Sequence, residues 1–132
     1  MILADTGFLV AAISEDDQHH RRSLEISATI PPRYITTWPC VTEAMHLLGI
    51  ASAQEKLRQQ IEIGILRLYA PTHEDALRAF ALMRRYADAP MDFADASLVV
   101  AAEVLIISRI LTFDRHFYVY RINDKTSFEV IS

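Results

Sequence analysis

Residues 93–114 read FADASLVVAAEVLIISRILTFD, and they indicate the fold class of this sequence. Phe93 to Glu103 is small and apolar almost all round, which predicts a helix buried on every side. Leu105 to Thr112 is rich in isoleucine and leucine and predicts a segment containing a central strand. A buried helix leading into a buried strand is typical of α/β proteins, in which helices cover both faces of a parallel sheet.

Strands and helices alternate in both directions from this stretch. The predicted strands are Met1 to Ala4, Arg33 to Thr37 and Leu66 to Ala70, with weaker ones at Tyr118 to Tyr120 and Phe128 to Ile131. The predicted helices run from about Phe8 to Ile13, His19 to Ile30, Val41 to Ile50, Ser52 to Ile63, Pro71 to Tyr86 and Phe93 to Glu103. This alternation implies right-handed βαβ units and a mostly parallel sheet with helices on both faces.

Capping residues place several of these helix starts. Asp5 or Thr6 can cap the first helix, and Thr72 with Asp75 opens the long one. Ser52 and Glu55 have the Ser-x-x-Glu spacing of a capping box.

Composition restricts the class of protein. The chain has 132 residues, 52% of them apolar, which suits one domain spanning residues 1–132. Its net charge of −4 argues against a protein that coats nucleic acid by charge alone. The single cysteine, Cys40, excludes an internal disulfide and suits a reducing compartment. Neither a membrane span nor a signal peptide is visible, and we expect a cytoplasmic protein.

Four carboxylates are expected to meet at one edge of the sheet. Asp5 follows the first strand and Asp114 follows the strand ending at Thr112. Asp95 lies in the first turn of the buried helix, and Glu43 lies early in the helix after the second strand. Ligands of such folds sit beyond the carboxyl ends of the strands, where clustered carboxylates would repel unless a cation neutralised them. Mg²⁺ and Mn²⁺ prefer oxygen ligands and can activate a water for attack on phosphorus.

Each of these acids also has a purely structural interpretation. Asp5 could be only a helix cap, Glu43 a solvated helix residue, and Asp114 a turn residue. Asp95 fits a structural role less well, because an unpaired carboxylate in a buried segment is costly. Asp92, three residues earlier, is better explained as the cap of that helix than as a metal ligand.

Four segments together resemble the PIN domain, specifically the VapC-type toxin ribonucleases of bacterial toxin–antitoxin pairs. They are Ile2 to Gly7, Thr42 to Ala44, Met91 to Leu98, and Leu111 to Phe117. The most specific feature is the Asp-Ala helix, followed nineteen residues after Asp95 by Asp114 in a Thr-x-Asp-x-x-Phe sequence. Two departures are visible: no glycine separates the buried helix from the next strand, and Asp92 is an additional acid.

The resemblance implies a fold, a site and partners. The fold would be a three-layer α/β/α sandwich with a mostly parallel sheet. Asp5, Glu43, Asp95 and Asp114 would hold Mg²⁺ or Mn²⁺, and Thr6 and Thr112 would support them. The implied activity is metal-dependent endonucleolytic cleavage of RNA. The implied partners are the RNA substrate, a small antitoxin and a second copy of the chain in a homodimer.

Arginines are the candidate RNA contacts, since a chain of net charge −4 needs local cations to hold a phosphodiester backbone. The candidates are Arg115, Arg109, Arg21-Arg22 and Arg84-Arg85. Arg115 is favoured because it adjoins Asp114, whereas most of the others suit solvated helix faces. Cys40 is interpreted as a small buried apolar residue rather than a nucleophile.

Other classes of protein compete with this interpretation. A PIN-fold domain that has lost catalysis and only binds partners would share the same pattern. A Mg²⁺-binding receiver-like signalling domain needs a lysine near the last strands, and neither Lys56 nor Lys125 is well placed. A haloacid-dehalogenase-like phosphatase needs a second acid where this chain has Gly7.

Overall fold

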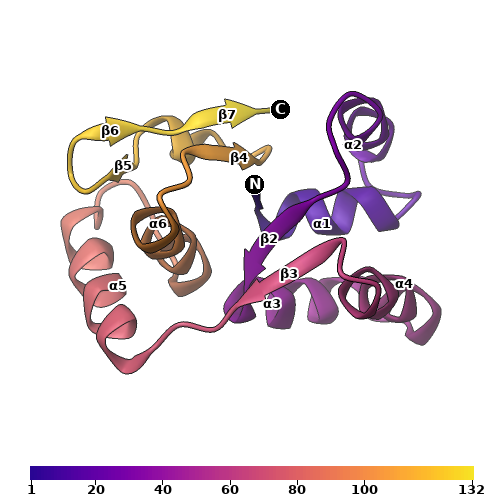
Figure 1. Cartoon of the computed structure of the whole chain (residues 1–132), viewed down its shortest axis with the longest axis horizontal. Helices are drawn as coiled ribbons and strands as arrows, with labels where there is room; N and C mark the ends of the chain where they lie inside the picture. The colour runs from indigo at the N-terminus through magenta and orange to yellow at the C-terminus, as the bar shows by residue number, and fades with distance from the viewer.

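Five parallel strands form the central sheet of the structure, a computed structural model that describes all residues 1–132 (Figure 1). The strand order is β3-β2-β1-β4-β7, and every neighbouring pair is parallel. The strands are β1 (Ile2–Ala4), β2 (Tyr34–Thr37), β3 (Leu66–Tyr69), β4 (Arg109–Leu111) and β7 (Glu129–Ile131). The predicted parallel sheet is confirmed, and β1 is its middle strand.

Six α-helices surround this sheet. They are α1 (Thr6–Ile13), α2 (His20–Ser27), α3 (Trp38–Leu48), α4 (Ala51–Glu62), α5 (His73–Arg85) and α6 (Phe93–Leu105). A 3-10 turn, η1 (Arg115–Tyr118), and a small antiparallel hairpin of β5 (Arg121–Ile122) and β6 (Thr126–Ser127) complete the chain. None of the helices combines the length and the apolar character that crossing a membrane requires.

Two apolar cores lie on opposite faces of the sheet, because successive side chains of a strand point to opposite sides. Leu3 of β1 packs in the core that contains α6 and part of α5, whereas Ile2 and Ala4 pack in the core formed with α1, α3 and α4. In Figure 1, α5 and α6 lie to the left, and α1, α2 and α4 lie to the right. The three-layer α/β/α arrangement is therefore confirmed.

Helix α6 is the buried helix that the sequence predicts. Every residue from Ala96 to Ala102 is buried, and both faces of the helix are apolar. Asp92 caps it and forms a reciprocal capping box with Asp95. The predicted box of Thr72 and Asp75 at the start of α5 is also present.

The predicted capping box at Ser52 is wrong. Helix α4 begins at Ala51, its cap is Ile50, and no side chain caps it. Gly49 ends α3 with a φ of 71°, so the chain reverses at once and the new helix begins before Ser52. Glu55 pairs instead with Arg58 along the exposed face of α4.

The predicted strand at Tyr118 to Tyr120 is also wrong. Asp114 accepts a hydrogen bond from the His116 main-chain N–H and starts a 3-10 turn there. Phe117 and Tyr120 are fully buried while Tyr118 and Val119 are exposed, which is the spacing of a turn rather than the alternation of a strand.

Ile106 carries the backbone strain of the link between α6 and β4. It ends α6 with a φ of 57°, a left-handed conformation that β-branched residues avoid, and 91% of its surface is exposed. We expect Ile106→Gly to raise the free energy of unfolding by about 1 kcal/mol, because glycine adopts this conformation without strain and little packing is lost.

Urea denaturation measures this effect, with Val104→Gly as the matched control. Val104 lies inside α6 and is also exposed, so glycine there should lower stability by about 0.5–1 kcal/mol. Equal destabilisation by both glycines would show that the Ile106 conformation carries no strain.

Candidate metal centre

Three carboxylates from distant parts of the chain meet at the carboxyl edge of the sheet. Asp5 follows β1, Asp114 follows β4, and Asp95 lies in the first turn of α6. One oxygen from each of the three lies within 4.8 Å of the others. The pairing of Ala4 with Leu111 places the ends of β1 and β4 side by side, which brings Asp5 and Asp114 together.

Asp5 is held by two hydrogen bonds in a buried position. Its Oδ1 accepts from the Thr6 main-chain N–H at 2.8 Å, and its Oδ2 accepts from the Thr112 hydroxyl at 2.7 Å. The same Thr112 oxygen accepts from the Asp114 main-chain N–H at 3.0 Å. Thr112 therefore links two of the three acids, whereas the buried Thr6 hydroxyl has no hydrogen-bond partner.

Asp95 and Asp92 have different surroundings. Asp92 Oδ1 accepts from the Asp95 main-chain N–H at 2.7 Å, and Asp95 Oδ2 accepts from the Asp92 main-chain N–H at 3.2 Å. Asp92 is exposed and lies outside the three-carboxylate cluster, so it acts here as a helix cap. Asp95 is partly buried, and its second oxygen makes no hydrogen bond within the protein.

His116 was not predicted as a site residue, yet its ring contacts Asp114. Its Nδ1 lies 2.7 Å from Asp114 Oδ1, and its ring stacks against Tyr120 with the centroids 6.3 Å apart. The sequence indicates this contact by spacing. His116 lies two residues after Asp114, and a turn capped by an aspartate brings the side chain at that position back toward the cap.

Glu43 lies beside the cluster and not within it. It is partly buried on α3 and lines a shallow hollow with Asp92, Trp38 and His46. Burial raises the pKa of Glu43, and the negative charge of Asp92 raises it further. Glu43 also helps to raise the pKa of Asp5, so the two carboxylates interact electrostatically.

The acids repel one another. Burial, together with the charges of Asp114 and Glu43, raises the pKa of Asp5 to about 6 against the effect of its hydrogen bonds. Burial, together with the charges of Asp92 and Asp5, raises the pKa of Asp95 to about 8. The possible ligands are all carboxylate oxygens, and they lie so close together that their repulsion disfavours ionisation. Such a set fits a hard divalent cation such as Mg²⁺ or Mn²⁺.

Proton release should accompany metal binding, because a ligating carboxylate must be ionised. Because the pKa values of Asp5 and Asp95 are raised to about 6 and about 8, the acidic cluster keeps a proton between about pH 6 and pH 8. We therefore expect the affinity for Mn²⁺ to rise about tenfold per pH unit in this window. Calorimetric titration in two buffers of different ionisation enthalpy should show about one proton released. An affinity that does not change with pH would contradict this electrostatic description.

The two favoured arginines lie at different ends of β4. Arg115 follows Asp114 directly, is exposed, and lines a hollow beside it. Arg109 begins β4 at the opposite edge of the sheet and pairs with Glu129 at 3.7 Å. The structure thus brings Arg115, and not Arg109, to the acidic cluster.

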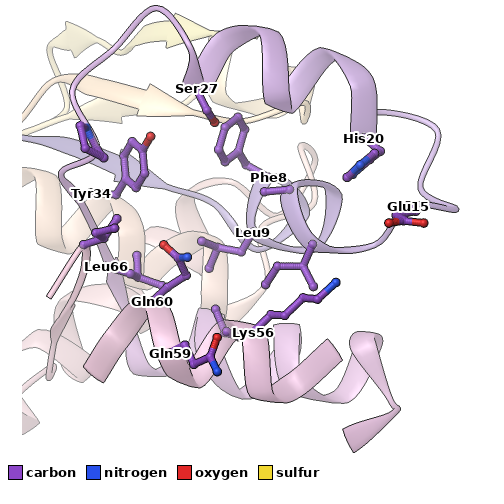
Figure 2. Close-up of a pocket in the computed structure, with 15 residues that line it drawn as sticks. Phe8, Leu9, Glu15, His20, Ser27, Tyr34, Lys56, Gln59, Gln60 and Leu66 are labelled. Carbon is purple, nitrogen blue, oxygen red and sulfur yellow. The ribbon is translucent and has the colours of Figure 1, made fainter. Parts of the chain in front are cut away.

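Cys40 and an apolar pocket supply no carboxylate to this cluster. Cys40 is fully buried and burial raises the pKa of its thiol to about 11, as its predicted apolar role requires. A pocket of about 420 Å³ lies between α1, α2 and α4 and contains none of the clustered acids. Leu9 and Leu66 are among the residues that line it (Figure 2).

Comparisons with known proteins agree with this fold. The PIN domain family model matches residues 2–123, so the chain belongs to the PIN domain family. No curated protein matches it significantly.

Solved structures with a similar fold include a toxin and a toxin–antitoxin complex. VapC20 of Mycobacterium tuberculosis, described as a sarcin-ricin-loop-cleaving toxin, has a TM-score of 0.80 at 21% identity, over 87% of this chain and 91% of that one. A Klebsiella pneumoniae toxin–antitoxin complex has a TM-score of 0.68 at 18% identity, over 89% and 90%. FitAcB of Neisseria gonorrhoeae has a TM-score of 0.66 at 17% identity, over 98% and 97%.

Proposed function

We propose that this protein is a metal-dependent endoribonuclease, the toxin of a type II toxin–antitoxin pair. The observation that carries the proposal is the cluster of Asp5, Asp95 and Asp114, whose oxygens lie within 4.8 Å of one another. The PIN fold and the likeness to toxins support the same conclusion. RNA in the cytoplasm is the proposed substrate.

The three aspartates would hold Mg²⁺ or Mn²⁺. When bound, the cation would neutralise charge on the phosphate and lower the pKa of an attacking water. Thr112 orients the Asp5 carboxylate and fixes the main chain of Asp114. His116 restrains the Asp114 side chain through its ring nitrogen.

Glu43 has a separate role in this proposal. Its raised pKa and its position beside the cluster suit a group that orients the attacking water and accepts its proton. The 3′-oxygen is the proposed leaving group, which gives 5′-phosphate and 3′-hydroxyl ends.

The proposed protein partners are an antitoxin encoded beside the toxin and a second copy of the chain. A structurally similar chain from Klebsiella pneumoniae belongs to a toxin–antitoxin complex, which supports the first. The exposed apolar side chains of Trp38, Phe80 and Phe93 support an interface between copies. Light scattering of the purified chain is expected to give the dimer mass, and a monomer at high concentration would contradict this.

Incubation of a mixed RNA pool with Mn²⁺ or with EDTA tests the activity. Wild type should cleave only with metal, and Asp95→Asn should lose at least about 100-fold in rate. Asp88→Asn is the matched control, because Asp88 is exposed in the loop before α6 and outside the cluster. Equal cleavage by the two variants would reject the site. No cleavage by any of them would favour a PIN-fold domain that only binds partners.

A further inference from the structure

A second hollow, with basic side chains on its walls, adjoins the acidic cluster. It has a volume of about 310 Å³, and its wall includes Asp114 of the cluster and Thr112, which donates to Asp5. The rest of its wall comes from the start of α2, from η1 and from the end of β7. The residues are His19, Arg22, Phe113, Arg115, Tyr118 and Ser132.

Basic side chains outnumber acidic ones in the wall of this hollow. Arg22 and Arg115 line it with His19, and Asp114 is the only acidic side chain among its lining residues. The chain as a whole has a net charge of −4. The other hollow beside the cluster, which Glu43 of α3 and the α6 cap Asp92 line, is acidic. A polyanion that reaches the cluster is therefore attracted on the side of Arg22 and Arg115.

The cationic side chains retain free donors. Arg115 forms no ion pair, and Arg22 uses one N–H toward the Ser132 main-chain oxygen at 2.9 Å and one toward Glu25 at 3.4 Å. A guanidinium has five N–H donors, so Arg22 is held in place with donors to spare.

His19 is held in position by stacking. Its ring lies on Phe113 with centroids 4.2 Å apart and an interplanar angle of 11°, and Phe113 in turn stacks on Phe8 at 5.8 Å. The ring nitrogens of His19 make no hydrogen bond within the protein, so they remain available to a ligand.

We propose that this hollow binds a phosphate of the RNA strand beside the one that lies at the acidic cluster. Arg115 and Arg22 supply charge-assisted hydrogen bonds, and His19 supplies a donor whose orientation the Phe113 stack fixes. This inference rests on the proposed function, because it assigns the position of the same RNA substrate. It also places the more tightly held part of the strand over η1 and α2.

The test is RNA binding without cleavage. Asp5→Asn protein in EDTA is titrated with a fluorescent single-stranded RNA, and the affinity is measured by anisotropy over a range of KCl concentrations. Adding Arg115→Ala or Arg22→Ala should weaken binding about fivefold to tenfold. Each should also lower the slope of log affinity against log salt by about 0.7. Arg67→Ala is the control, because Arg67 is exposed, has no ion pair, and lies on edge strand β3, away from β4.

Equal binding and equal salt slopes for the Arg115, Arg22 and Arg67 variants would overturn the inference. Cleavage is scored separately with the native Asp5 and Mn²⁺. Binding that depends on both arginines in a chain that does not cleave would support this inference and contradict the proposed function. Cleavage by a chain whose RNA binding does not depend on either arginine would support the proposed function and contradict this inference.

Discussion

Asp5→Asn is expected to lower the affinity for Mn²⁺ by about 100-fold or more and to lower RNA cleavage by about 1,000-fold. Asp5 is the most buried of the three clustered acids and joins β1 to the site. Asparagine has nearly the same shape but supplies no negative charge for the cation. Calorimetry with Mn²⁺ and a cleavage assay on the same preparations measure the two losses.

The fold should survive this change. Asparagine is as good a helix cap as aspartate, so the hydrogen bond from the Thr6 N–H at the start of α1 can persist. The charged form of Asp5 is disfavoured in the folded protein, because its pKa is raised from 3.8 to about 6. Without metal, the variant should therefore have a higher Tm than wild type above about pH 6, and this gain should vanish as the pH falls toward 3.8.

Asp88→Asn serves as the control for both readouts. Asp88 is exposed and makes no hydrogen bond or ion pair, so neither the Tm nor the Mn²⁺ affinity should change. A folded Asp5→Asn variant that binds Mn²⁺ as well as wild type would remove Asp5 from the metal site.

Thr112→Val is expected to lower Mn²⁺ affinity by about 10- to 100-fold. The Thr112 hydroxyl is buried, donates to Asp5 at 2.7 Å and accepts from the Asp114 N–H at 3.0 Å. Valine matches its shape but leaves both partners without this hydrogen bond, so stability should also fall by about 1–3 kcal/mol.

Thr112→Ser separates the positioning role from general packing. Serine keeps the hydroxyl and loses only a methyl group, so it should retain most of the Mn²⁺ affinity despite some loss of stability. If serine and valine lower the affinity equally, the hydroxyl does not position Asp5.

Much of the site could be predicted because the topology determines it. Parallel strands end at one edge of their sheet, so acids that follow β1 and β4 must lie close together. Asp95 could also be predicted as a site residue. A carboxylate at the start of a helix as apolar as α6 is costly unless it is paired or binds a ligand.

The parts that could not be predicted depend on local geometry with weak sequence signals. Ile106 occupies a left-handed position where the pattern favours glycine, so the exact end of α6 could not be read from the chain. The β5–β6 hairpin has a sequence signal in Asn123-Asp124, residue types that tolerate positive φ, and both residues adopt positive φ in the turn. The contact of His116 with Asp114 depends on the 3-10 turn, which replaced the expected strand.

The chemistry of the cleaved ends distinguishes hydrolysis at the acidic cluster from cleavage without metal. A purified wild-type sample is incubated with a mixed RNA pool and Mn²⁺, and the products are probed with enzymes that require a 5′-phosphate or a 3′-hydroxyl. The proposed hydrolysis at the cluster of Asp5, Asp95 and Asp114 predicts fragments with both kinds of end, formed only with metal. Fragments with 5′-hydroxyl and 2′,3′-cyclic phosphate ends, formed equally in EDTA, would contradict it.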